Sequence, residues 1–454
     1  MSVTRGRRSL YGMLGASSVS IVGTRISAMA LPWFVLTETD SPTLTGLVLM
    51  FEMAPYVISK ALGGPLVDRH GPRLVSVTTD VTSGLLIALV PVLHLTGQLA
   101  LPERMPLLLA IVAAVGVVRG PGDGARNALI PAVADDARLS LERVTGLDGT
   151  VDRASGLLAA GAGGLLIAGF GAAETVALNA GAFLLSAVIV ATTAPRPPAA
   201  TSASPGPCRR GGVGAYAAEL REGAAYIRRE PLLRSVVAMI AVTNLLDAAL
   251  QSVLLPVWLR DNGYGARELG LLGMTFGIAS ALSSLVATAA AGRFSRRWAY
   301  LIGFTLAGAP RFVVMALGAP LWVVVAVAAV SGLGAGFINP VIGAVFFERT
   351  PRPLVGRVGS LADSLAWAGI PLGGVAAGVA ITALGLAPAI VLAGAAYLVA
   401  TTVPGLRPEW LDMDRGDDDD GRAAMADASA GRRASTASAP SAQQAETEGI
   451  APRV

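Results

Sequence analysis

The chain has 454 residues and a formal net charge of +4, and 53% of its residues are hydrophobic while only 15% are charged. Soluble domains carry roughly 25% charged residues, so this composition excludes an ordinary soluble enzyme or binding domain. The hydrophobic residues form long blocks, and a helix that crosses a bilayer core of about 30 Å needs roughly 20 of them. The sequence therefore predicts an all-α membrane protein.

Taken in chain order, the hydrophobic blocks predict twelve transmembrane helices. The first block, from Tyr11 to Leu36, is too long for the apolar region of a signal peptide and has no clear cleavage site. The expected helices span 11–36, 43–67, 74–96, 105–125, 146–171, 174–194, 232–258, 268–292, 298–318, 320–345, 357–383 and 386–405.

Arginine residues alternate between the loops that join these helices. Arg5, Arg7 and Arg8 precede the first helix, and Arg69 and Arg73 lie between the second and the third. The loops on the opposite side hold few basic residues, and cytoplasmic loops are the ones enriched in Lys and Arg. We therefore expect both termini in the cytoplasm and the chain in the cell inner (plasma) membrane.

A Pro-, Gly- and Ser-rich segment at 195–231 divides the helices into two sets of six. Its last part is charged and predicts an amphipathic helix on the cytoplasmic face. The expected organisation is an N-terminal six-helix bundle at 1–194, a cytoplasmic linker at 195–231, a C-terminal six-helix bundle at 232–405 and a disordered cytoplasmic tail at 406–454.

Two short matches, in the same order and at nearly the same offset, relate the two halves. Asn127–Val133 is similar to Asn339–Val345, and Arg143–Leu147 is similar to Arg357–Leu361. Repeated halves suit a carrier whose binding site lies between them near the middle of the membrane. We therefore expect two six-helix pseudo-repeats.

The turn after the second helix carries the most specific motif, Gly64-Pro-Leu-Val-Asp68-Arg69-His-Gly71-Pro-Arg73. It resembles the loop motif G-x-L-a-D-R-x-G-R-K of the major facilitator superfamily, with a proline at one basic position. Gly64 would let two helices approach closely, Gly71 permits a tight turn, and Asp68 can accept hydrogen bonds from a helix N-terminus. The resemblance implies that this last contact helps to close the cytoplasmic side. An ordinary polar turn is the alternative.

Further phrases resemble one branch of that superfamily, the drug–proton antiporters that include macrolide and siderophore exporters. They are Arg126–Pro131 and Gly146–Thr150. The predicted fifth helix keeps the glycine pair Gly163 and Gly164 of the antiporter pattern but lacks its Gly-Pro. The resemblance implies the major facilitator fold, export and a small-molecule substrate.

Charged residues inside the expected helices are rare and are candidates for function. Arg25 and Glu52 both lie near mid-depth and could pair, and Lys60 with Asp80 is a second possible pair. For each charge, a structural ion pair is the alternative. The candidates for proton coupling, with Glu52 first, are Glu52, Arg25, Asp80, Asp152 and Asp363.

A second set of residues is expected to line a central cavity. Asn244, Asp247 and Gln251 are spaced so that they share one face of a helix, and lipid would not tolerate that polar face. Trp367 is deep enough to touch a substrate, although packing is its alternative role. Arg119 is a candidate for tuning a nearby carboxylate, or for a structural ion pair.

The sequence predicts a secondary active transporter and not an enzyme, because no nucleophile or metal constellation is found. The favoured function is proton-coupled efflux of a small apolar or amphipathic compound by alternating access. An importer or facilitator of the same fold is one alternative, and a non-transporting sensor or membrane-embedded enzyme is another. We expect a monomer that interacts with its substrate, protons and the lipid bilayer, without a cofactor, metal or nucleic acid.

Overall fold

The computed structural model describes residues 2–195, 213–289, 295–351, 354–407 and 410. Every regular element in this part of the chain is a helix, so the expected all-α class is confirmed. Residues 196–212, which form the first part of the expected linker, lie outside the described residues, and so does most of the expected tail. Trp410, which belongs to that expected tail, is fully buried and donates a hydrogen bond of 3.0 Å to Ser235.

Three helices of the first half, the first, fourth and fifth expected ones, are clearly longer than expected, whereas the second ends earlier, at Leu62. Ser140 caps the helix that follows it by accepting a hydrogen bond from the backbone N–H of Arg143, so the polar connection expected between the fourth and fifth helices is itself largely helical. The elements are α1 (Ser2–Thr39), α2 (Pro42–Leu62), α3 (Gly64–His70), α4 (Pro72–Leu95), α5 (Met105–Ala137), α6 (Leu141–Phe170) and α7 (Ala172–Thr193).

In the second half, several of the expected helices are divided into shorter segments. The seventh expected helix contains a five-residue π-helix, η1, and the charged part of the linker forms α8. The elements are α8 (Val213–Arg229), α9 (Pro231–Ala249), η1 (Leu250–Leu254), α10 (Leu255–Asp261), α11 (Ala266–Ala289), α12 (Arg296–Ala307), α13 (Ala309–Ala316), α14 (Leu321–Arg349), α15 (Val355–Trp367), α16 (Ile370–Leu384) and α17 (Leu386–Gly405).

Within the described residues, eleven helices are long and apolar enough to cross a membrane, and a shorter apolar stretch runs from Tyr300 to Ala316. This stretch is interrupted at Gly308, where an added Cβ would lie 1.8 Å from the ring of Tyr397. Counted together, the eleven helices and the interrupted stretch account for the twelve expected crossings.

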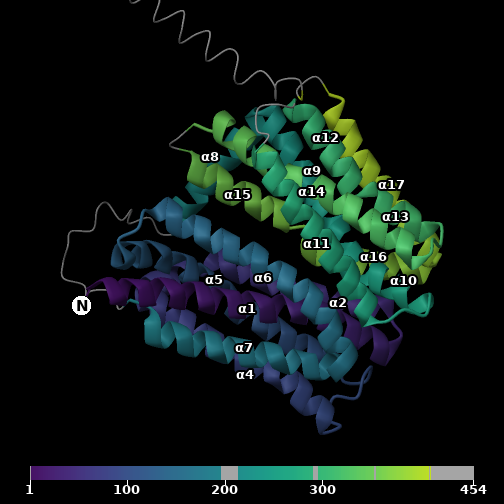
Figure 1. The fold of residues 1–454 in the computed structure, drawn as a ribbon, viewed down its shortest axis with the longest axis horizontal. Helices are drawn as coiled ribbons and strands as arrows, with labels where there is room; N and C mark the ends of the chain where they lie inside the picture. The colour runs from purple at the N-terminus through teal and green to yellow at the C-terminus, as the bar shows by residue number, and fades with distance from the viewer. Residues whose placement is uncertain (1, 196–212, 290–294, 352–353, 408–409, 411–454) are drawn as a thin grey trace, which may run out of the picture.

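Two groups of helices, α1–α7 and α9–α17, lie side by side (Figure 1), and they contact one another mainly between α2 and α16 and between α6 and α11. Glycine lies where backbones of the two groups touch. A Cβ on Gly46 of α2 would lie 2.1 Å from the carbonyl oxygen of Gly374 in α16, and a Cβ on Gly164 of α6 would lie 2.6 Å from the Cα of Gly270 in α11. Small residues permit such close packing, so these glycines define two crossings between the halves.

Further contacts between the halves lie at the extracellular ends of the helices. Arg260 forms a 2.6 Å ion pair with Asp40 and donates a 2.9 Å hydrogen bond to the carbonyl oxygen of Leu36. The hydroxyls of Thr43 and Thr382 lie 2.9 Å apart. Gly46, Gly164 and Gly270 lie toward the outer ends of their helices, so the two halves touch on the outside. They diverge toward the opposite side (Figure 1), so the protein faces the cytoplasm.

We expect Gly46→Ala to destabilise the folded protein, because its methyl group would overlap the backbone of α16. Overpacking costs about 1–3 kcal/mol, more than the roughly 1 kcal/mol by which Ala normally improves a helix. Thermal unfolding of the purified protein in detergent measures the change. Gly181→Ala is the matched control, because nothing lies within 4 Å of its added Cβ; equal unfolding temperatures for the two variants would contradict the prediction.

Candidate functional site

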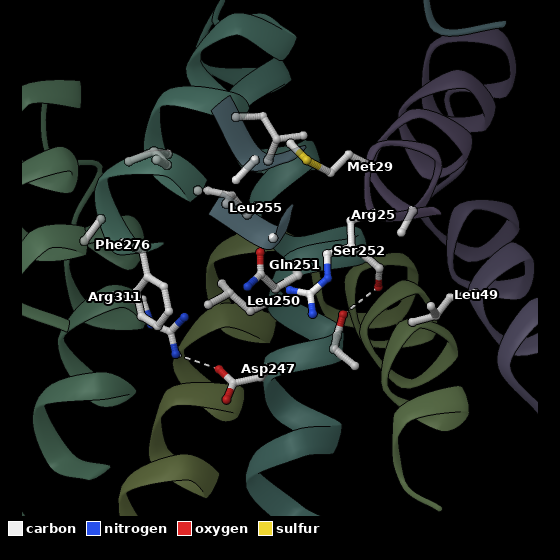
Figure 2. Close-up of a pocket in the computed structure, with 18 of the residues that line it drawn as sticks. Arg25, Met29, Leu49, Asp247, Leu250, Gln251, Ser252, Leu255, Phe276 and Arg311 are labelled. Atoms are coloured by element: carbon white, nitrogen blue, oxygen red, sulfur yellow. Dashed lines mark hydrogen bonds and ion pairs between the residues drawn. The ribbon is translucent and has the colours of Figure 1, made fainter. Parts of the chain in front are cut away.

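The described residues line an open cavity of about 580 Å³ between the two halves (Figure 2). Small-molecule sites have volumes of about 300–1,000 Å³ and mostly apolar walls. Most of the lining here is apolar, as at Leu250, Leu255 and Phe276, and both halves contribute to it. The cavity therefore has the size and character of a small-molecule site.

The polar stripe predicted from the seventh hydrophobic block lies on this cavity wall. Asn244, Asp247 and Gln251 all line it, and the amide of Asn244 donates a 2.9 Å hydrogen bond to the carbonyl oxygen of Ala366. Gln251 belongs to the π-helix η1, and short π segments are frequent at functional sites.

One ion pair of the second half faces the cavity. Arg311 donates to Asp247 at 2.6 Å, and its guanidinium lies over the ring of Phe276, 5.2 Å from the ring centre. The side chain of Asp247 is 36% exposed and that of Arg311 only 12%, so a ligand in the cavity meets the carboxylate first. The sequence reasoning did not single out Arg311, although an arginine beside Pro310 in an apolar stretch is a signal that could have found it.

The possible pair of Arg25 with Glu52 does not form. Arg25 lines the central cavity and forms its ion pair with Asp152 of α6, at 3.0 Å. Gly156, one turn after Asp152, leaves room for the guanidinium, because a Cβ there would lie 2.3 Å from a nitrogen of Arg25. The two residues share a depth, but Arg25 points toward α6 and not toward α2.

Glu52 lies inside the first half, away from the central cavity. Its side chain is 9% exposed, and a carboxylate oxygen lies 3.8 Å from Arg119 of α5. The close approach of α2 and α5 creates this pair: a Cβ on Gly116 would lie 2.3 Å from the carbonyl oxygen of Glu52, and one on Gly120 would lie 2.5 Å from the backbone nitrogen of Lys60. Arg119 therefore lies beside a carboxylate but does not line the central cavity.

A chain of polar contacts continues from Arg119 toward the cytoplasmic end of α2. Arg119 lies 3.7 Å from Asp123, and Tyr56 donates a 2.9 Å hydrogen bond to the same carboxylate. Lys60 in turn donates a 3.2 Å hydrogen bond to the hydroxyl of Tyr56. Glu52, Tyr56 and Lys60 follow one another at intervals of four residues and so share a face of α2, a spacing that could have indicated Tyr56 from sequence.

The second possible pair, Lys60 with Asp80, does not form either. Asp80 accepts two hydrogen bonds from Arg126, of 2.9 and 3.0 Å, and a third of 2.7 Å from Ser186. Asp80 is 4% exposed and faces α5 and α7, whereas Lys60 lies 5.5 Å from the ring centre of Trp367 in the other half.

The remaining candidates lie away from the central cavity. Asp363 and Trp367 are exposed on α15 and are not part of its lining, so the expected contact of Trp367 with a substrate in this cavity finds no support here. No three His, Cys, Asp or Glu side chains gather as metal ligands within the described residues.

The loop motif adopts the expected tight turn. Gly71 ends α3 at a φ of 83°, and Arg73 donates to the carbonyl oxygen of Ala191. The close helix approach expected at Gly64 occurs one residue earlier: nothing lies within 4 Å of a Cβ on Gly64, whereas one on Gly63 would lie 2.9 Å from the Cα of Pro121.

The acidic residue and the basic residue at the centre of this motif, Asp68 and Arg69, are both exposed. As far as the described chain extends, Asp68 accepts no hydrogen bond from another helix. The contact that the motif resemblance implies belongs to a protein closed on its cytoplasmic side, and this structure is open on that side.

Comparison with known proteins places this arrangement in a large family. The model of the Major Facilitator Superfamily matches residues 13–243 and 237–409. The chain is 30% identical over 424 residues to the multidrug efflux pump Tap of Mycobacterium tuberculosis, covering 90% of this chain and 97% of that protein. It is 29% identical over 409 residues to Tap of Mycolicibacterium fortuitum, covering 90% and 98%.

Solved structures share the fold at low sequence identity. The nucleoside transporter NupG superposes with a TM-score of 0.64 at 15% identity, covering 87% of this chain and 98% of that one. A bacterial homologue of the human lysosomal transporter Spinster, in an inward-facing and unoccupied conformation, gives a TM-score of 0.67 at 14% identity, covering 92% and 98%.

We expect Asp80 and Arg126 to act as a structural pair. Arg126→Met leaves a buried carboxylate without its cation, which costs about 3–5 kcal/mol, whereas replacing both partners in Asp80→Leu/Arg126→Met should restore most of the stability. Thermal unfolding in detergent compares the two variants. A double variant that is stable but inactive in transport would show instead that Asp80 takes part in proton coupling.

Proposed function

Because the chain belongs to the Major Facilitator Superfamily, and is thus a secondary transporter of small molecules and not an enzyme, we propose that it couples proton entry to export of a small apolar or amphipathic compound. It is a multi-pass protein of the plasma membrane. The observation that carries the proposal is the separation of an apolar cavity between the halves from a buried carboxylate, Glu52, inside the first half.

The lining of the cavity supports an apolar or amphipathic substrate. Its apolar walls can bury a hydrophobic body, while the partly exposed carboxylate of Asp247 can bind a polar or cationic end. The relatives named as multidrug efflux pumps support export as the direction. An importer of the same fold would use the same cavity, so direction has to be measured.

The surroundings of Glu52 support a role in proton binding. A carboxylate inside a protein is tolerated as an ion only with a compensating partner, and Arg119 at 3.8 Å is that partner. Arg119 also lies 3.7 Å from Asp123, so it has a second carboxylate to hold when Glu52 takes up a proton. Protonation of Glu52 therefore does not leave the arginine unpaired.

The inward-facing arrangement supports loading from the cytoplasm. The contacts that close the outside are the two glycine crossings and the ion pair between Arg260 and Asp40. Export by alternating access requires these contacts to separate while the cytoplasmic side closes.

We expect Glu52→Gln to abolish proton-driven transport without unfolding the protein, because Gln fills the same space but cannot exchange a proton. Efflux of a fluorescent substrate by vesicles with an imposed proton gradient should fall to background, while substrate exchange without a gradient persists. Glu38→Gln, the same change at an exposed position at the outer end of α1, is the control. Retention of full gradient-driven transport in Glu52→Gln would remove Glu52 from the mechanism.

We expect Asp247→Asn to weaken binding of an amphipathic cation such as ethidium about tenfold, since a hydrogen bond to a charged group contributes about 1.5–3 kcal/mol. Binding of a neutral dye of similar size should change much less. Fluorescence titration of the purified protein measures both affinities, with Asp135→Asn, an exposed change at the cytoplasmic end of α5, as control. Equal losses for both dyes would mean that Asp247 shapes the cavity and does not bind the charge.

A further inference from the structure

A groove of about 380 Å³ lies between α9 and α17, starting where α9 begins and α17 ends. Both helices are long and apolar enough to cross a membrane, and these two ends are the cytoplasmic ones, so the groove starts at the cytoplasmic edge of the bilayer. Its lining includes Arg234, Ser235, Ala238 and Val242 of α9, Pro404 of α17, and Arg407 just after α17.

This groove faces the lipid and not the central cavity. Ser235 and Ala238 line the groove, and each is nine residues before a residue of the cavity wall, Asn244 and Asp247 respectively. Nine residues are about two and a half turns of an α-helix, so the members of each pair point in opposite directions. Ala238 and Val242 are exposed, which places an apolar surface against the acyl chains of the bilayer.

The cytoplasmic mouth of the groove is positively charged. Arg234 and Arg407 are both exposed, and within the described part of the chain neither forms an ion pair. The guanidinium of Arg234 donates a hydrogen bond of 3.2 Å to the carbonyl oxygen of Arg228, itself an exposed arginine. Glu230, the acidic residue just before α9, lies 3.8 Å from Arg349 instead. The charges of the two arginines in the groove are therefore available to an anion.

The groove is held in shape by contacts of the protein itself. Trp410 is fully buried, donates a 3.0 Å hydrogen bond to Ser235 in the groove, and lies 5.1 Å from the ring centre of Tyr300 in α12. Arg297 of α12 donates to the carbonyl oxygen of Gly405, the last residue of α17, at 3.1 and 3.2 Å. These contacts tie the cytoplasmic ends of α9, α12 and α17 together, so a ligand meets a preformed groove.

We propose that this groove binds an anionic phospholipid of the cytoplasmic leaflet, with its phosphate at Arg234 and Arg407 and an acyl chain along Ala238 and Val242. The guanidinium group matches phosphate oxygens in geometry and charge, and basic pockets between transmembrane helices on the cytoplasmic side suit anionic headgroups. Ala238 and Val242 follow Arg234 by one and two turns, about 6 and 12 Å deeper in the membrane. A soluble phosphate would leave this apolar part of the groove unused.

The test is the affinity of the purified full-length protein for single lipids. Native mass spectrometry of the protein in mild detergent, titrated with phosphatidylglycerol or with phosphatidylcholine of the same acyl chains, measures the binding of the first lipid. We expect phosphatidylglycerol to bind at least tenfold more tightly, because its phosphate is not neutralised by a headgroup cation. Equal affinities for the two lipids would overturn the proposal.

Changes of the two arginines identify the binding site. Arg234→Gln and Arg407→Gln should each weaken phosphatidylglycerol binding about fivefold, and the double variant about thirtyfold, since a basic residue near the membrane surface contributes about 1 kcal/mol. Arg138→Gln/Arg143→Gln removes the same charge from exposed positions on the cytoplasmic side of the first half and should stay within twofold of wild type. An equal loss in this control would show that net charge, and not the groove, attracts the lipid.

The apolar part of the groove is tested separately from its charges. Ala238→Trp fills this part and should weaken phosphatidylglycerol binding about tenfold, whereas Ala395→Trp, at an exposed position on another face of α17, should have little effect. Displacement of the lipid by an equal concentration of glycerol 3-phosphate would identify a site for soluble anions and overturn the proposal. So would phosphatidylglycerol binding that appears only after the acidic run Asp417–Asp420 is changed to Asn, because the tail would then be the occupant.

Discussion

Backbone contact at two glycine crossings is the constraint on which the rest of the structure depends. Where α2 meets α16 and where α6 meets α11, the helices approach too closely for any side chain. These crossings close the extracellular side and leave the helices diverging toward the cytoplasm, with the cavity between them. They also involve α2, which carries Glu52 and Lys60, so a movement of the halves about the crossings necessarily moves both residues relative to the second half.

The charged residues inside the membrane are arranged as ion pairs between helices. Arg25 with Asp152, Arg126 with Asp80 and Arg311 with Asp247 each join two helices of the same half. An isolated charge in this environment is costly, and pairing within one half lets that half move as a unit without breaking an ion pair. The contact between Lys60 and Trp367 differs because it joins the two halves.

The depth of a charged residue in the membrane could be predicted from sequence, but the direction in which its side chain points could not. Residue counts placed Arg25 and Glu52 at a common depth, yet their partners depend on the rotation of each helix about its axis, which no spacing within one helix reveals. The position of Asn244, Asp247 and Gln251 on the cavity wall was easier to predict, because three polar residues on one face of a helix must avoid lipid. The sequence predicted the close approach of a neighbouring helix at Gly64, but the structure has it at Gly63. Either glycine would permit the approach, and only the position of α5 decides which of them is in contact.

The distance between Glu52 and the cavity has a consequence for how such a protein can change over generations. Residues that line the cavity, such as Leu250, Phe276 and Met315, do not pack around Glu52, whose enclosed neighbours include Ile87, Val112 and Phe183. Substitutions in the first set therefore alter the shape offered to a compound without disturbing the buried carboxylate. Selection can broaden or shift the range of expelled compounds one lining residue at a time, while the proposed source of energy stays the same.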